Sequence, residues 1–505
     1  MRARISHWAR GLPQRHGRRT LILLALILVL GFGLRAYRVA EPLATPGDDS
    51  RAYFALSKAL YEEGSYGGPG FRDASDWSPG APLLYAAAFY ATGGAREGAA
   101  RIVELLFGLA AIVVAYLLGC RLNCRLVHVA GLIAAFGVAV YPPFIHSTGA
   151  LFSEPPAIFT LPAAILAFLW ASEDRTSGGG TGGVPSGMSR SGDMQSEVGA
   201  AQPRSTFGAK REARAPKFRE GTPPVPPLLR WLVPGLLFGA TALIRPEYLL
   251  VGIAFVGLAA VRVGRERGWR PGLGAATLLA AGLLLPILPW AVRNAVVLDR
   301  TVPISTGGGK ALYVGTYLPA DGEYQRVKAL LAKRYLGRDL APGSEALDRV
   351  NPTPLFDRVA ARHPQLPRDE ALGKVGRENL DRYLGEDPVG YAAMTARKVW
   401  RMWSSGVGEA MSATAGRVVQ VSIVLLGLAG LGVLALRRRW WEAVAMATPL
   451  VLVTAVGAAS LAAPRRNEIL MAIVFPLAGV ALARAGAAIS SSRPWSSKQA
   501  SSPPS

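Results

Sequence analysis

Two adjacent aspartates, Asp48 and Asp49, follow the first long apolar run in the segment TPGDDSRAYFALSKALYEEGSYGG, residues 45–68. A carboxylate held near a hydroxyl group can act as a general base and remove its proton. The same pair could instead begin the helix expected over 50–63, because Asp is a favoured N-terminal cap. One aspartate suffices for a cap, so the other is free for chemistry.

Other ionisable side chains stand at the ends of later apolar runs. Such residues near a membrane are candidates for function, because placing a charge in lipid is costly. Each also has a structural interpretation, either as an acid in the first turn of a helix or as an arginine that reaches the lipid headgroups. The candidates are Glu154 in SEPPAIF, Arg245 in LIRPEYLL, Arg293 in LPWAVRN, and Arg465 and Arg466 in APRRNEIL.

The chain that must position these residues has 505 residues, of which half are hydrophobic and only 18% are charged. Apolar runs recur along it, several of them near the roughly 20 residues that cross a bilayer core. The sequence therefore predicts an all-α polytopic membrane bundle of about ten transmembrane helices, with a segment at 80–94 too short to span. The predicted spans are 20–38, 98–119, 127–143, 155–172, 228–244, 246–262, 273–291, 417–436, 441–462 and 468–487.

The net charge of +22 could suggest a nucleic-acid partner. The basic residues, however, lie mostly in the tails and between apolar runs, where they set membrane orientation and contact lipid headgroups. If the N-terminus is cytoplasmic and successive spans cross the membrane in opposite directions, ten spans place the C-terminus in the cytoplasm. The same alternation places all the polar loops named above on the outer face. Arg465 and Arg466 oppose the positive-inside rule there, so topology does not explain them.

The long region between the seventh and eighth spans is the largest expected outside the membrane. Its start, 301–317, has the β-branched residues and glycines of a strand and turn, whereas an amphipathic helix is expected from Pro388. We therefore expect a small α/β or mostly helical region there. The predicted division is an N-terminal membrane half (1–172), a disordered cytoplasmic linker (173–227), membrane helices (228–296), an extracytoplasmic region (297–413), C-terminal membrane helices (414–488) and a disordered tail (489–505).

The sequence assigns no cofactor with certainty. The two cysteines, Cys120 and Cys124, form neither a zinc motif nor a disulfide framework. A divalent cation near Asp48, Asp49 and Glu154 is conceivable, but their spacing does not define such a site.

In their order along the chain and in their expected side of the membrane, the polar segments resemble those of the polytopic GT-C glycosyltransferases that use polyprenyl-phosphate sugars. That family includes protein O-mannosyltransferases, the aminoarabinose transferase that acts on lipid A, and bacterial transferases acting on lipid A core. The resemblance implies a bacterial-type plasma membrane protein and places Asp48 at the position of the general base. The segments that carry it are LRAYRV, PGDDSRAYFALSKALYEEGSYG, WSPGAPLLYAAAFY, YPPFIHSTGALFSEP, LIRPEYLL, LPWAVRN and PRRNEIL.

The residue chemistry suits that activity. Transfer of a hexosyl or pentosyl group from a lipid phosphate needs a base for the acceptor hydroxyl, and cations for the departing phosphate. We therefore expect a one-step displacement with inversion, with Asp48 as base and Asp49 and Glu154 as supporting acids. The acceptor would be a lipid, a glycan or a protein. The expected phosphate ligands are Arg245, Arg293, Arg465 and Arg466.

Two other classes of function stay open at this point. A transporter or flippase for a lipid-linked or anionic substrate would carry ionisable residues at mid-span and an inverted repeat. A non-catalytic assembly partner would tolerate replacement of the acidic pair.

Overall fold

The computed structural model describes residues 17–41, 48–67, 74–123, 127–173 and 229–491, apart from the side chains of Asp48, Ala74, Ser490 and Ser491. All regular elements in these ranges are helices, so the predicted all-α fold is confirmed. The predicted linker lies outside the described residues except for its first residue, and the predicted tail lies outside them from residue 492 onward.

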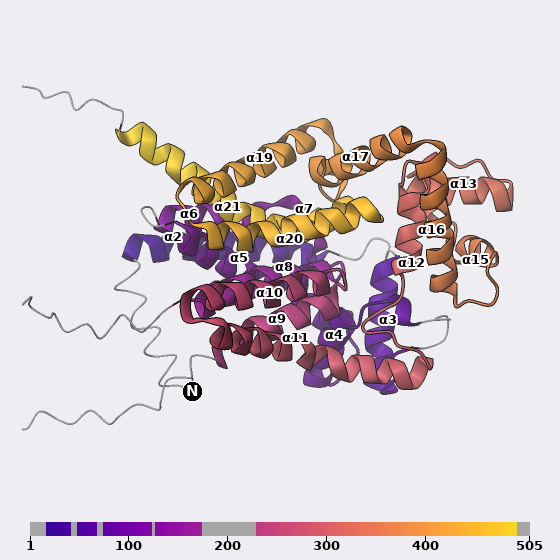
Figure 1. Cartoon of the computed structure of the whole chain (residues 1–505), viewed down its shortest axis with the longest axis horizontal. Helices are drawn as coiled ribbons and strands as arrows, with labels where there is room; N and C mark the ends of the chain where they lie inside the picture. Colours follow the sequence, from indigo (N-terminus) through magenta and orange to yellow (C-terminus); the bar gives the residue numbers. More distant parts are fainter. Residues whose placement is uncertain (1–16, 42–47, 68–73, 124–126, 174–228, 492–505) are drawn as a thin grey trace, which may run out of the picture.

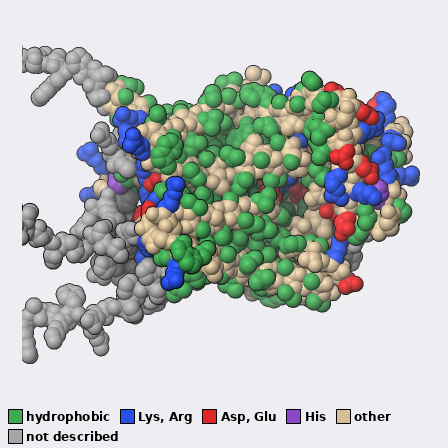
Figure 2. Space-filling view, in the orientation of Figure 1, with side chains coloured by type: hydrophobic (Ala, Val, Ile, Leu, Met, Phe, Trp, Pro, Cys, Tyr) green, Lys and Arg blue, Asp and Glu red, His purple; other side chains and the backbone are tan. Residues whose placement is uncertain are grey.

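Eight helices in the described part are long and apolar enough to cross a membrane, and the chain is a multi-pass membrane protein. Figure 2 shows the corresponding apolar belt between two ends where charged side chains gather. The eight are α2 (Arg18–Ala40), α5 (Glu97–Leu122), α8 (Glu154–Ala171), α10 (Tyr248–Arg267), α11 (Trp269–Leu298), α19 (Thr414–Leu436), α20 (Trp440–Ala459) and α21 (Pro464–Ser491).

The other two predicted spans form shorter apolar helices. These are α6 (Val127–Val140) and α9 (Leu232–Ile244), the latter preceded by the short turn η3 (Leu229–Trp231). At 1.5 Å rise per residue, the 14 residues of α6 cover about 21 Å, which is less than the roughly 30 Å of a bilayer core. All ten predicted spans are thus helical, although two are short.

Glycines allow the membrane helices to pack closely. A Cβ atom added at Gly235 of α9 would lie 2.2 Å from the carbonyl oxygen of Leu279 on α11. One added at Gly430 of α19 would lie 1.9 Å from that of Leu477 on α21. Small residues at such crossings let helix backbones approach in a membrane, where burial of apolar surface gives little drive to association.

Small helices cover one end of the bundle. After α2 the chain forms α3 (Asp48–Glu62), the turn η1 (Ala74–Asp76) and α4 (Gly80–Thr92). The predicted short segment at 80–94 is α4, which packs against both α3 and α5. The Phe89 ring of α4 meets Phe54 and Tyr61 of α3 edge to face, so α3 is held on the bundle.

A second group of helices lies at the same end of the bundle, at the right of Figure 1. It has a separate apolar core, in which Phe356 and Leu372 are fully buried. We call it the extramembrane region. It contains α12 (Gly308–Thr316), η4 (Leu318–Ala320), α13 (Tyr324–Leu336), α14 (Glu345–Asp348), α15 (Thr353–Ala360), α16 (Arg368–Glu386), α17 (Pro388–Ser404) and α18 (Glu409–Ser412).

The strand predicted within 301–317 is wrong. Residues 308–316 form helix α12, and Tyr313 and Val314 of its buried face enter the core of the extramembrane region. Tertiary packing against α16 outweighs the local preference of the β-branched residues. All regular elements of the extramembrane region within the described residues are therefore helices.

Lys398 fastens the extramembrane region to the membrane helices. Its side chain is fully buried, and Nζ donates hydrogen bonds to the carbonyl oxygens of Gly315 (2.8 Å), Ala458 (2.8 Å) and Ser460 (2.9 Å). One ammonium group thus joins α17, α12 and the end of α20, and it has the three donors that this takes.

Candidate active site

Prolines fix the helix ends at which the candidate residues stand. Pro155 lies in the first turn of α8, Pro464 begins α21, and Pro246 follows the end of α9. Proline lacks an N–H and is tolerated in a first turn, and it disfavours helical geometry in the residue before it. The prolines therefore leave three charged residues at helix ends: Glu154, Arg245 and Arg465.

Four of the predicted site residues meet in one network. Glu154 Oε1 accepts hydrogen bonds from Arg245 Nη2 and from Arg465 Nε, the latter at 2.7 Å. Arg465 Nη1 also donates to Asp49 Oδ2. We call these four residues the acid–arginine cluster. Its formal charges cancel, and it joins the ends of α3, α8, α9 and α21.

The four side chains of the cluster differ in how far they are exposed to solvent. The Glu154 side chain is 0% exposed and that of Arg245 is 19% exposed, whereas Asp49 and Arg465 are 30% and 36% exposed. Burial lowers the pKa of Arg245, but the carboxylates of Glu154 and Glu247 raise it by more, so this guanidinium keeps its charge. Asp49 and Arg465 are thus partly exposed to solvent, while Arg245 and Glu154 form a more deeply buried ion pair.

The local field favours an anion. Helices α3, α8 and α21 all begin at the cluster, and the N-terminus of a helix carries a partial positive charge. The guanidinium of Arg465 also lies 4.7 Å from the centre of the Phe152 ring, in the range of a cation–π contact that orients it. Two forked cations beside three helix N-termini suit the oxygens of a phosphate group.

A buried carboxylate shapes the loop that delivers Glu154. Glu104 of α5 accepts hydrogen bonds from the backbone N–H groups of Gly149 (2.6 Å), Leu151 (3.2 Å) and Phe152 (2.6 Å). The hydroxyl of Tyr85 donates to it at 2.7 Å. Leu151 has a left-handed backbone with φ of 57°, which costs a residue with a Cβ atom about 1–2 kcal/mol. Glu104 offsets that cost and holds the loop.

Arg101, one turn before Glu104, ties this loop to the end of α2. It donates to the carbonyl oxygens of Gly149 (2.9 Å), Arg38 (3.1 Å) and Glu41 (2.8 Å). The sequence analysis did not single out Arg101 or Glu104. Their signal is two ionisable residues within one turn of an otherwise apolar run, the predicted span 98–119.

Helix α3 is docked onto the same loop, which places Asp49. Ser50 Oγ donates to the carbonyl oxygen of Ala150 at 2.6 Å. The hydroxyl of Tyr53 donates to Ser153 Oγ at 3.2 Å. Ser50 is nearly fully buried, so the start of α3 is anchored rather than free at the surface.

Three buried oxygen atoms near the cluster have no hydrogen-bond partner within the described part of the chain. They are Glu154 Oε2, Tyr248 Oη and Glu468 Oε1. The charge of Glu154 acts on both of the other residues. An unpaired buried polar group costs about 1–3 kcal/mol, and each such group in a native structure calls for an explanation. Their gathering beside a charged cluster marks this region for function.

The remaining predicted site residues lie apart from the cluster or cannot be placed. Asp48 is the first residue of α3, but its side chain lies outside the described residues. Arg293 donates to the carbonyl oxygen of Tyr66 at 2.9 Å and to Asn294 Oδ1 at 3.0 Å. Arg466 donates to Ser460 Oγ at 3.4 Å.

No group of three His, Cys, Asp or Glu side chains that could hold a metal ion occurs in the described part of the chain. Asp49 and Glu154 both contact Arg465 instead.

The glycine-rich segment at 306–310 binds a carboxylate of this chain. The N–H groups of Gly309 and Lys310 each donate a hydrogen bond to the Asp369 carboxylate at 3.1 Å.

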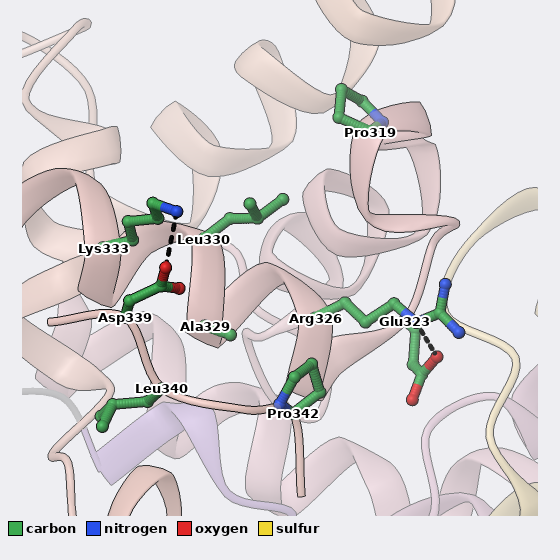
Figure 3. Close-up of a pocket in the computed structure, with 9 residues that line it drawn as sticks. All are labelled: Pro319, Glu323, Arg326, Ala329, Leu330, Lys333, Asp339, Leu340 and Pro342. Atoms are coloured by element: carbon green, nitrogen blue, oxygen red, sulfur yellow. Dashed lines mark hydrogen bonds and ion pairs between the residues drawn. The ribbon is translucent and has the colours of Figure 1, made fainter.

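A recess of about 580 Å³ lies on α13 of the extramembrane region. Figure 3 shows its two ion pairs, Lys333 with Asp339 at 2.7 Å and Arg326 with Glu323 at 2.8 Å. Both ion pairs of this recess are exposed to solvent, whereas Glu154 of the cluster is fully buried. The acid–arginine cluster is the stronger candidate site, because it combines charge, burial and unpaired oxygens.

Solved structures with a similar arrangement of helices include the archaeal oligosaccharyltransferase AglB from Archaeoglobus fulgidus. With a tethered acceptor peptide it gives a TM-score of 0.52 at 14% identity, over 94% of this chain and 50% of that chain. The structure in complex with an inhibitory peptide and a dolichol-phosphate gives a TM-score of 0.50 at 15% identity, over 94% of this chain and 51% of that chain. The chain has a GT-C-like fold.

The GT-C-like fold confirms the resemblance predicted from the sequence, at the level of architecture. This chain spans about half the length of the oligosaccharyltransferase. ArnT from Cupriavidus metallidurans, bound to undecaprenyl phosphate, aligns over 93% of this chain and 79% of that chain, at 16% identity and a TM-score of 0.34. No family model and no curated protein sequence matches the chain.

Proposed function

We propose that this protein is a glycosyltransferase that moves a sugar from a polyprenyl-phosphate donor to an acceptor hydroxyl at the outer face of a membrane. The observation that carries the proposal is the acid–arginine cluster, in which Arg245 and Arg465 converge on Glu154 at one end of a GT-C-like bundle. We assign the protein to a bacterial-type plasma membrane, with both termini in the cytoplasm.

Arg245 and Arg465 would receive the phosphate of the donor. When the sugar leaves, negative charge grows on the phosphate, and preorganised cations stabilise that charge most where water is excluded. The oligosaccharyltransferase of the same fold is described in complex with a dolichol-phosphate, so this architecture accommodates a polyprenyl-type phosphate. Arg293 and Arg466 are further candidates for phosphate contacts at the margin of the site.

Asp48 would act as the base. It precedes Asp49, which contacts Arg465, so its backbone lies beside the proposed phosphate site. The acceptor oxygen gives its proton to Asp48 and attacks the anomeric carbon. The bond from that carbon to the phosphate oxygen breaks, its electron pair stays with the phosphate, and the configuration inverts. Asp49 and Glu154 support the arginines in this scheme.

Two buried charges within the spans fit a transferase better than a transporter. A transport path would place free ionisable groups inside the spans. The buried arginine of α2, Arg35, instead donates to the backbone carbonyl oxygens of Val138 and Ala139, both at 2.9 Å. Glu104 is likewise saturated by the loop before Glu154. These intramembrane charges therefore serve packing.

The test is a transfer assay on membranes with radiolabelled polyprenyl-phosphate sugars of the hexosyl and pentosyl classes, and lipid, glycan and peptide acceptors. Asp48→Asn is expected to lower the rate by about 10²–10⁴-fold, the usual contribution of a general base. Glu63→Gln, just after the far end of α3, removes an exposed charge and should transfer normally. An Asp48→Asn protein that is expressed normally and transfers at the wild-type rate would refute the assignment of the base.

A further inference from the structure

Both arginines of the cluster already hold carboxylates. Arg465 uses Nη1 for Asp49 and Nε for Glu154, and Arg245 uses Nη2 for Glu154. A phosphate that binds Arg465 in the forked geometry contacts two of its three nitrogen atoms, and Nε and Nη1 both hold carboxylates. A phosphate held in this way must therefore displace at least one carboxylate of this chain.

The two carboxylates differ in how firmly they are held. Glu154 is completely buried and is shared by two arginines, so an uncompensated charge would remain if it left. Asp49 is 30% exposed, and the arginine that it contacts is itself 36% exposed. An ion pair that water reaches is weaker than a fully buried one, so Asp49 is the easier of the two to displace.

Charge balance also favours this exchange. The cluster is neutral as it stands, with two carboxylates and two guanidiniums. A phosphodiester donor has one negative charge, so its exchange for Asp49 leaves the charge on the two arginines unchanged. Displacement of both carboxylates would instead leave Glu154 buried without a cation, which is strongly unfavourable.

We propose that Asp49 is the exchangeable counter-ion of Arg465, which the phosphate of the polyprenyl-phosphate donor replaces when it binds. This inference rests on the proposed function, and it makes Asp49 a positioning residue rather than a second base. Because Ser50 and Tyr53 still anchor the start of α3, the exchange involves the Asp49 side chain rather than the whole helix.

The experiment measures binding of undecaprenyl phosphate to the purified full-length protein in nanodiscs of uncharged lipid. Undecaprenol, which lacks the phosphate, is the matched ligand control. Asp49→Asn removes the competing carboxylate, so it should bind undecaprenyl phosphate about two- to fivefold more tightly, as expected for loss of a partly exposed ion pair. Its affinity for undecaprenol should not change. Glu63→Gln should bind both ligands as the wild type does.

A second variant covers the case in which Asp49→Asn fails to fold. Asp49→Ser removes the same charge with a different side chain, and should give the same tightening. If the wild type binds undecaprenyl phosphate, but the folded variant binds it equally or less tightly, the inference is wrong while the proposed function stands. If the wild type binds undecaprenyl phosphate no better than undecaprenol, both are wrong.

Discussion

At the scale of single residues, one oxygen atom organises the site. Glu154 Oε1 accepts hydrogen bonds from both Arg245 and Arg465, and this fixes the two guanidiniums relative to each other. A forked guanidinium can hold a carboxylate with one edge and present further N–H groups to a ligand. A lysine in the same position offers a single point of charge.

Replacement of Arg465 by lysine tests this geometry. Lys cannot contact Asp49 and Glu154 through two separate nitrogen atoms, so Arg465→Lys should lower kcat/KM for the donor by about tenfold or more, roughly 1.4 kcal/mol. The matched variant is Arg382→Lys, which changes an arginine whose ion pair with Glu386 is exposed on α16. We expect less than about threefold loss there, since exposed ion pairs contribute little. Equal losses in the two variants would contradict the special place of Arg465.

At the scale of helices and loops, the site is a meeting of helix ends. Most of this could be predicted from the sequence, because long apolar runs define the membrane helices and prolines mark their ends. The acidic pair, Glu154, Arg245 and Arg465 could likewise be picked out by residue type and by loop side. The partners of each charge could not, since contacts such as that of Asp49 with Arg465 join residues that are 416 positions apart.

The missed residues have the same physical explanation. Glu104 and Arg101 bind backbone groups of a loop more than 40 residues further along the chain, and a sequence pattern does not reveal such a partner. The error at 301–317 arose in the same way, because packing on α16 decides the conformation of α12. Local propensity is a weak guide wherever distant contacts dominate.

The loop that Glu104 holds yields the prediction at this scale. In Glu104→Gln one carboxylate oxygen becomes an NH₂ group, which cannot accept the hydrogen bonds of the N–H groups that face it. Each unpaired buried N–H costs about 1–3 kcal/mol, so the melting temperature should fall. The loop would also shift Glu154, and a displacement of about 1 Å can cost 10²-fold in rate.

Kinetics well below the melting temperature separate the two effects. We expect kcat to fall by at least about tenfold at a temperature where the variant is still folded, because the phosphate site is misaligned. Glu97→Gln is the control, since Glu97 is a half-exposed acid on the same helix, and its ion pair with Arg101 is long at 3.9 Å. A Glu104→Gln protein that melts earlier but keeps the wild-type kcat would show that Glu104 only stabilises the fold.

At the scale of the whole molecule, the extramembrane region is joined to the bundle, because α17 packs against α19, α20 and α21, and α12 packs against α20. The tightest link is the backbone of α12 against the end of α20. A Cβ atom at Gly315 would lie 2.1 Å from the carbonyl oxygen of Ser460. Lys398 closes this joint from the side of α17, with hydrogen bonds to both residues.

Lys398→Met should therefore loosen the extramembrane region from the bundle. Methionine preserves the apolar length of the side chain but leaves three buried carbonyl oxygens without their donor, at a total cost of about 3 kcal/mol or more. Limited proteolysis should then cut first within the extramembrane region, and the melting temperature should fall. Lys333→Met provides the comparison, because its ion pair with Asp339 is exposed and such pairs contribute at most about 1 kcal/mol. If Lys398→Met and Lys333→Met resist protease and heat equally well, the prediction is wrong. Backbone packing alone would then hold the extramembrane region on the bundle, and both variants should bind the donor with the same affinity.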